Sequence, residues 1–227
     1  MKKLLLAFVL AMNFIGVNSY ASIESVFATI PVQDAGRVKP FDTFARETLQ
    51  LIYGKKEYNG KPAVEVVFTW MIMPHHWDEV EFVQIDQKEI KKQLGLNQEQ
   101  KRFSPKELLS KEQLQTLFSQ LKTKRDNQEK LNPYFQSVER LQSQITFYKA
   151  IGQGFTPGWI PQSDSDAWVP LKDFSIDYTE LFLKITKGFA ATLQSPDNLS
   201  DLRAAVQLFN EKAKGENLDK YPSQQKI

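Results

Sequence analysis

The stretch from Pro31 to Glu47, PVQDAGRVKPFDTFARE, decides how we expect this chain to fold. Pro31 and Pro40 fix the backbone φ angle at both ends and favour extended conformations in the residues before them. Between the prolines the chain has to turn. Asp34-Ala35-Gly36 suits that turn, because Asp side chains bond nearby backbone amides and glycine adopts positive φ angles. The pattern predicts a tight bend that leads directly into a helix.

The second half of this stretch has the spacing of an amphipathic helix that begins near Pro40 and stops at Gly54. On its polar face Asp42 and Arg46 are four residues apart, so they can form an ion pair worth about 0.3–0.5 kcal/mol on an exposed surface. Physical reasoning alone favours a rigid entry loop that clamps a structural helix. The apolar side chains recur at helical spacing: Phe41, Phe44, Ala45, Leu49 and Ile52.

The same stretch resembles a motif, approximately PVQDGGR-x-KP-x-DTFARE, of long-form CcsA/ResC-type cytochrome c biogenesis proteins, the system II machinery. In that family the motif lies near the start of the extracytoplasmic domain. Ala35 departs from the motif, where a second glycine is usual, so Gly36 alone is left to carry an unusual φ angle. Looser similarity covers most of the remaining chain: Pro74 and Trp77, Ser104 to Leu108, Pro157 to Pro170, and Tyr221-Pro222-Ser223.

The resemblance implies an accessory or partner-docking module of system II cytochrome c maturation, the machinery that delivers and attaches haem, and no catalysis by this chain itself. It implies membrane-bound CcsA/CcsB-type proteins as partners, with apocytochrome c as a further candidate. The Phe41 and Phe44 rings would anchor the bend to the domain. The polar side chains that would contact the partner are Gln33, Asp34, Arg37, Lys39, Asp42 and Arg46.

Residues 1–21 have the three parts of a signal peptide: Lys2 and Lys3, an apolar core over 4–17, and small residues around the end of Ser19-Tyr20-Ala21. We expect cleavage after Ala21 and a periplasmic location. An uncleaved anchor is the alternative, although the apolar core is shorter than the roughly 20 residues that span a bilayer. No later segment is apolar for long enough to cross a membrane.

Composition excludes several classes of protein. The 227 residues include 29 basic and 27 acidic ones, so the formal charge is zero once the two signal-peptide lysines are removed, which argues against nucleic acid as a partner. There is no cysteine, which excludes disulfide exchange, a Cys-x-x-Cys-His haem attachment site and thiol catalysis. About 200 residues can bury an adequate core as one domain without disulfides.

Helical patterns dominate the rest of the chain, with a polar connection over 55–61 and a short extended segment within 79–86. The helices that begin near Ser110 and Pro133 suggest an antiparallel hairpin. The predicted fold is mainly α: a single-domain, bundle-like array over residues 22–215 with at most a small β element, followed by a loose polar tail over 216–227. Further helix starts are expected at Pro62, Gln87, Ser104, Asp177, and Asp197 or Ser200.

The longest irregular stretch, residues 152–174, is rich in glycine, proline and aromatic residues. Long loops in compact domains are often functional, so Trp159 and Trp168 are candidates for partner recognition, although large aromatics more often fill a core. The competing hypothesis follows from this loop. It is a periplasmic peptide- or ligand-binding protein, unrelated to haem, that uses the loop as a clasp.

His75 and His76 are adjacent, so they point in different directions and cannot both bind one metal from a regular helix. We predict no metal site. We favour a surface or capping role for both histidines. The alternative is that either one ligates haem, which is the one cofactor considered for this chain. Acidic pairs such as Asp164 and Asp166 lack a recognisable catalytic partner, so we expect no enzymatic activity and disfavour a cell-wall hydrolase.

Overall fold

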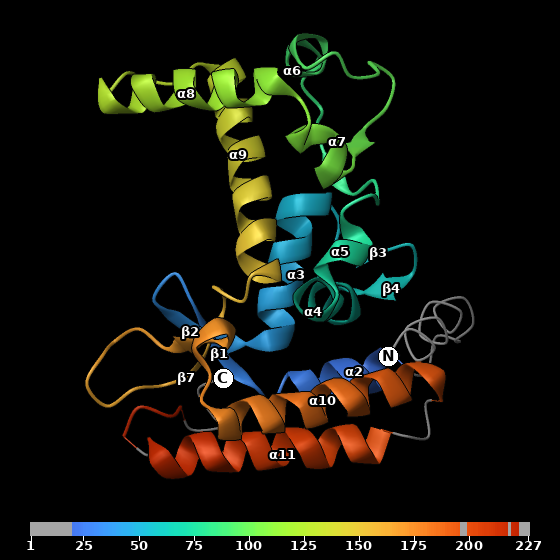
Figure 1. Cartoon of the computed structure of the whole chain (residues 1–227), viewed down its shortest axis with the longest axis vertical. Coiled ribbons are helices and arrows are strands. Elements are labelled where there is room, and N and C mark those ends of the chain that lie inside the picture. Colours follow the sequence, from blue (N-terminus) through green and yellow to red (C-terminus); the bar gives the residue numbers. More distant parts are fainter. Residues whose placement is uncertain (1–19, 196–198, 218, 223–227) are drawn as a thin grey trace.

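A computed structural model describes residues 20–195, 199–217 and 219–222 of the chain (Figure 1). The mainly α prediction is confirmed. The elements in chain order are α2 (Tyr20–Phe27), β1 (Pro31–Asp34), β2 (Arg37–Pro40), α3 (Phe41–Tyr53), β3 (Glu57–Tyr58), β4 (Lys61–Pro62), α4 (Ala63–Ile72), α5 (Pro74–Trp77), β5 (Val83–Gln84), α6 (Lys88–Gln93), β6 (Arg102–Phe103), α7 (Pro105–Leu109), α8 (Glu112–Asp126), α9 (Pro133–Gly152), β7 (Gly158–Ile160), β8 (Val169–Pro170), a 3₁₀ turn (Leu171–Asp173), α10 (Ile176–Gln194) and α11 (Leu199–Glu216).

Most helix boundaries follow local signals in the sequence. Gly54 ends α3 in the left-handed conformation with φ 84°, and the Ser104 hydroxyl accepts a hydrogen bond from the Glu107 amide at 3.1 Å. Several predicted starts are shifted by one or two residues. The helix expected from Ser110 begins at Glu112, and the one expected from Asp177 begins at Ile176. Neither start has a side-chain cap, so local sequence fixes it less firmly.

The strands are more numerous than the sequence patterns suggested. A four-stranded antiparallel sheet has the order β2-β1-β7-β8, and two further pairs are β3-β4 and β5-β6. The segment 55–61, expected as a plain polar connection, contains the β3-β4 hairpin, because Asn59 and Gly60 both adopt positive φ angles of 49° and 78°. β7 and β8 likewise give structure to much of the predicted loop 152–174.

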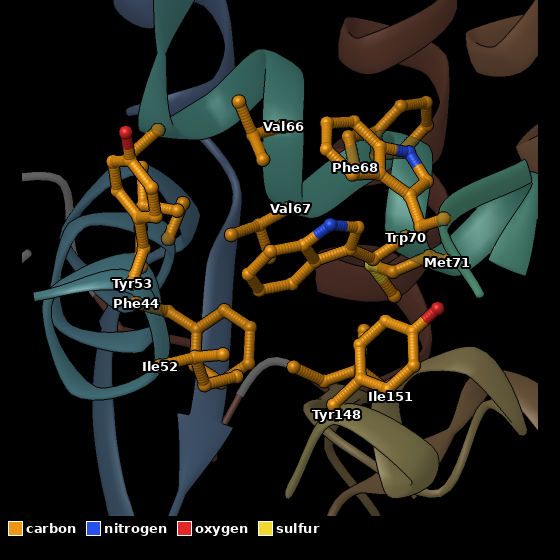
Figure 2. Packing of buried hydrophobic residues seen from close by; sticks show 14 of the residues in the cluster. Phe44, Ile52, Tyr53, Val66, Val67, Phe68, Trp70, Met71, Tyr148 and Ile151 are labelled. Carbon is orange, nitrogen blue, oxygen red and sulfur yellow. The ribbon is translucent and has the colours of Figure 1, made fainter. Parts of the chain in front are cut away.

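One hydrophobic cluster draws side chains from Ile23 near the start of α2 to Ala213 in α11. Phe27 of α2 lies 4.9 Å from Phe68 of α4, between ring centroids, and Phe68 lies 4.8 Å from Phe189 of α10. Figure 2 shows the neighbouring part, where α3, α4 and α9 meet around Trp70. Burying each large apolar side chain contributes about 1.5–3 kcal/mol.

The predicted antiparallel pairing of α8 with α9 is wrong. In Figure 1, α8 runs across the top of α9 instead of alongside it. The buried positions of α8 form a narrow stripe, Leu114, Leu117 and Leu121, whereas α9 packs its apolar face against α3 and α4. With that face of α9 already covered, α8 meets the first turns of α9 through its own second half, where Arg125 pairs with Glu139 and Lys124 lies over the Phe135 ring.

At the end of α11 and just beyond it, Glu216, Lys220 and Tyr221 make defined contacts, which a loose tail from residue 216 would not make. The Tyr178 hydroxyl donates to Glu216 Oε2 at 2.6 Å, and Lys220 Nζ donates to the Ser165 carbonyl at 2.8 Å. Tyr221 packs against the core. This apolar contact was not expected because the segment is polar in composition.

The N-terminal predictions fall mainly on residues 1–19, which lie outside the described ranges, as do 223–227. α2 begins at Tyr20, so cleavage after Ala21 would fall in its first turn, and this remains a prediction. Within the described ranges, no helix combines the length and apolar character that crossing a membrane requires.

Candidate docking site at the first hairpin

The motif Pro31 to Glu47 folds as one unit, the hairpin β1-β2 followed directly by α3. Asp34 faces Arg37 across a two-residue turn in which Ala35 and Gly36 have φ angles of 49° and 76°. Two successive positive φ angles match the twist of a hairpin. Ala35 adopts this conformation despite its Cβ, at a cost on the order of 1 kcal/mol that a second glycine would avoid.

Lys39 joins the hairpin to the helix. Its Nζ lies 3.1 Å from Asp34 Oδ2 on β1 and 2.7 Å from Glu47 Oε2 on α3. Burial by itself would lower the pKa of Lys39, but the hydrogen bonds to Glu47 and Asp34 outweigh it, so the pKa is raised. Lys39 therefore stays charged and is already occupied by two carboxylates of its own chain.

Asp42 and Arg46 form the expected pair, with Arg46 Nη2 2.7 Å from Asp42 Oδ2. Asp42 is buried, and its other oxygen, Oδ1, has no hydrogen-bond partner. Burial raises the pKa of Asp42, and the opposing effect of Arg46 does not fully offset it. Asp42 therefore lies too deep to contact a partner directly.

Gln33 ties the hairpin to the segment between β7 and β8. Its Nε2 donates to the Asp166 carbonyl at 2.7 Å, and its Oε1 accepts from the Trp168 amide at 2.8 Å. Both ends of this amide are used internally. Gln33 acts as a clamp between two segments that are distant in sequence.

Arg37 and Val38, at the tip of the hairpin, point outward. Val38 is 39% exposed, and the Arg37 side chain is exposed with no ion pair or hydrogen bond to any residue that the structure describes. Of the polar residues predicted to contact a partner, Arg37 is thus the one left free. We call Arg37 and Val38 the hairpin tip.

The burial of Trp159 and Trp168 does not favour these candidates for partner recognition as contact residues. Trp159 is 0% exposed, and its ring stacks on Phe41 with the centroids 5.1 Å apart. Trp168 is 7% exposed and packs over Gly158, where an added Cβ would come within 2.7 Å of Trp168 Cβ. The pairing of β7 with β1 places both tryptophans against the domain instead of in a mobile clasp.

The two histidines lie on the surface in α5. His75 is 97% exposed and its Nδ1 lies 3.2 Å from Asp78 Oδ2, while His76 is exposed beside Trp77. A haem bound at either residue would have its faces in solvent. Among residues 20–195, 199–217 and 219–222, no group of three or more His, Asp or Glu side chains is placed to hold a metal ion.

A groove of about 720 Å³, which sequence patterns did not indicate, lies between α2, α11 and residues 221–222. Thr29, in the turn that follows α2, and Asn210 of α11 meet in it, with Asn210 Nδ2 donating to the Thr29 carbonyl at 2.9 Å. Arg203 and Lys214, at exposed positions of α11, also line it. The spacing of these α11 residues along one helical face was the signal available in the sequence.

No protein-family model matches this chain, and no curated protein matches it at a significant level.

Proposed function

We propose that this chain is a periplasmic, non-catalytic module of system II cytochrome c maturation that docks on membrane-bound CcsA/CcsB-type proteins. Haem delivery and attachment would be carried out by those partners, with apocytochrome c as the client. The support comes from the motif Pro31 to Glu47, whose residue types match the family pattern at nearly every position.

The observation that carries the docking proposal is the contrast within the motif itself. Lys39, Asp42 and Gln33 are used to hold the hairpin, helix α3 and the β7-β8 segment together. This network fixes the hairpin tip on a rigid support and leaves Arg37 and Val38 facing solvent. A preorganised cation beside an apolar side chain is suited to bind a partner because little order is lost on docking.

The proposal is tested by replacing the tip in a strain that lacks the wild-type gene. We expect the double variant R37E/V38D to fold normally but to reduce the yield of mature c-type cytochromes about tenfold, because a reversed charge and a buried carboxylate oppose docking. The matched control L183D/K187E changes one exposed aliphatic residue of α10 and one exposed cation that pairs with no described carboxylate. The control should leave cytochrome maturation unchanged.

Two results would overturn the proposal. If c-type cytochromes mature normally in the deletion strain, the chain is not needed for cytochrome c maturation. Full complementation by R37E/V38D, with a CcsA/CcsB-type protein still co-purifying, would show that the docking surface lies elsewhere on the molecule.

The groove between α2 and α11 favours a second function, a periplasmic peptide- or ligand-binding protein unrelated to haem. Its volume lies within the range of small-molecule sites, about 300–1,000 Å³. Titrating the purified chain with haem and with a reduced apocytochrome peptide separates the two functions. If neither binds and no membrane haem protein co-purifies, the groove becomes the leading site.

A further inference from the structure

The charged residues are distributed very unevenly between two parts of the fold. Residues 88–152, which we call the arm, contain 13 basic and 7 acidic residues. The other described residues contain 13 basic and 19 acidic ones. The arm therefore carries a formal charge of +6 and the rest of the described chain −6, although the mature chain is neutral as a whole.

The arm comprises α6, β6, α7, α8 and α9 and forms the upper part of Figure 1, away from α2, α10 and α11. Four cations of the arm form ion pairs with carboxylates: Lys106, Lys122, Lys124 and Arg125. Other cations of the arm are exposed and have no ion pair with any described residue: Lys88, Lys92, Lys101, Lys130, Arg140 and Lys149.

Hydrogen bonds fix the loop and the helix ends that lie beside these exposed cations. Lys91, which is 4% exposed, donates through Nζ to the carbonyls of Gln98 and Gln100, and so fixes the loop after α6. The Tyr134 hydroxyl donates to Gln93 Oε1 and joins the start of α9 to the end of α6. The exposed lysines on α6 and its neighbours thus project from a connected base.

We propose that the arm is an electrostatic docking surface for an acidic segment of a partner protein. The surface is formed by Lys88 and Lys92 of α6, Lys101 before β6, and Lys130 between α8 and α9. Unpaired Glu89 and Glu99 lie nearby, but the cations remain in excess. The inference does not depend on the assignment to cytochrome c maturation, because it rests on charge and placement alone.

The chemistry of the arm favours protein over the other polyanions. A membrane-binding surface combines basic residues with exposed apolar ones that enter the interface, and in the described arm Leu109, at 37%, is the one large apolar side chain that is exposed. Single-stranded nucleic acid is held by exposed aromatic rings, whereas Phe118, Tyr134 and Phe135 are half-buried.

Pairing between two copies of the chain is the other electrostatic possibility, since the arm and the remaining part have opposite charge. Outside the arm, the acids without an ion pair in the described structure, such as Glu57, Glu180 and Asp201, belong to different elements and form no defined complementary patch among the described residues. An extended acidic segment can adapt to four spaced lysines, which a rigid second copy cannot do as readily.

The experiment measures binding of a fluorescent peptide of about 20 glutamates to the full chain by anisotropy at increasing salt. We expect binding to the wild-type protein at low ionic strength, with affinity that falls as salt screens the charges. The arm variant, with lysine-to-glutamine changes at four positions, should bind about tenfold more weakly or worse. Its substitutions are K88Q, K92Q, K101Q and K130Q.

A matched control removes the same charge from outside the arm, at exposed lysines that form no ion pair with a described residue: K55Q, K56Q, K184Q and K187Q. It should bind the peptide within about twofold of wild type. Circular dichroism melting of both variants should match the wild type, because exposed surface changes usually alter stability by less than about 0.5 kcal/mol each.

Several results would overturn the proposal. These are no peptide binding at low salt, equal loss in the arm variant and the control, or sedimentation that shows dimers dependent on the arm lysines. Arm-dependent binding to phosphatidylglycerol vesicles or to single-stranded DNA that is tighter than binding to the peptide would assign the surface to lipid or nucleic acid instead.

Discussion

The hairpin unit and the arm use charged side chains in opposite ways. In the hairpin unit, Lys39 and Arg46 are bound to carboxylates of the same chain, and Asp42 is buried. In the arm, the side chains of Lys88 and Lys92 face solvent and form no ion pair with any residue in the described part of the chain. The charged side chains of the first region stabilise local structure, whereas those of the second make the electrostatic potential at the surface of the arm positive. Substitutions should therefore affect stability in one region and association in the other.

The largest effect is expected beneath the hairpin, at Trp159. We predict that Trp159→Ala lowers the free energy of unfolding by about 3–5 kcal/mol, because it removes a fully buried indole that stacks on Phe41. Urea denaturation measures the change. Phe155→Ala is the control, since Phe155 is 55% exposed and should cost little. A small loss at Trp159 would mean that the hairpin is not anchored through β7.

The second effect separates two glycines. Gly158→Ala should destabilise the fold by about 1–3 kcal/mol, because the new methyl group would lie 2.7 Å from Trp168 Cβ and 2.9 Å from the Trp168 carbonyl oxygen. Gly215→Ala in α11 meets nothing within 4 Å and should be neutral or stabilising, by up to about 1 kcal/mol. Thermal and urea unfolding of both variants test the difference, and equal behaviour would contradict the close packing of β7 on β8.

A third effect depends on pH and concerns Glu65 of α4, which is 1% exposed and paired with Lys61. Burial raises the pKa of Glu65 above 4.5, and the hydrogen bond and charge of Lys61 reduce this shift without cancelling it. Above pH 4.5 the unfolded chain loses this proton before the folded chain does. The contribution of Glu65 to stability therefore falls as pH rises, by at most about 1.4 kcal/mol per pH unit.

Glu65→Gln removes this dependence, so the stability of the variant relative to wild type should rise with pH from 4.5 upward. Denaturant titrations at several pH values measure it. Glu79→Gln is the control with the opposite sign, because the hydrogen bond from Lys106 lowers the pKa of Glu79. A difference between Glu65→Gln and wild type that does not change with pH would show that Glu65 titrates normally in the folded state.

The smallest effect compares two cations of the same hairpin. Lys39→Ala should cost about 1 kcal/mol, since it breaks two partly exposed ion pairs. Arg37→Ala should change stability by less than about 0.5 kcal/mol, because Arg37 is exposed and unpaired in the described structure. If urea unfolding shows equal losses of unfolding free energy for the two variants, Lys39 does not stabilise the hairpin more than Arg37 does.

Local signals in the sequence predicted much of the hairpin unit and several helix ends. The turn at Asp34-Ala35-Gly36, the stop at Gly54 and the cap at Ser104 depend on neighbouring residues only, so sequence patterns identify them, although Ala35 shares the positive φ angle that was expected of Gly36 alone. The pairing of Gln33 with Gly158 joins residues far apart in the chain, and no local pattern encodes it. The burial of Trp159 and Trp168 was missed for that reason.

The candidate sites also combine features that local sequence predicts with features that depend on contacts between distant residues. The residue types of the motif were visible in the sequence, but their mutual pairing was not, and this pairing reduces the predicted contact set mainly to Arg37. The groove at α2 and α11 depends on tertiary packing. The basic excess of residues 88–152 was countable from the sequence, but a neutral total charge concealed it until the fold separated the arm from the rest.

The sheet order β2-β1-β7-β8 also bears on the sequence of events during biogenesis. The first hairpin can form as soon as residues 31–40 emerge, whereas the strand that covers its inner edge comes more than a hundred residues later. Until Gly158 arrives, β1 presents an open edge that neighbouring chains can join. A nascent chain that stalls before this point should therefore depend on chaperones far more than the finished protein.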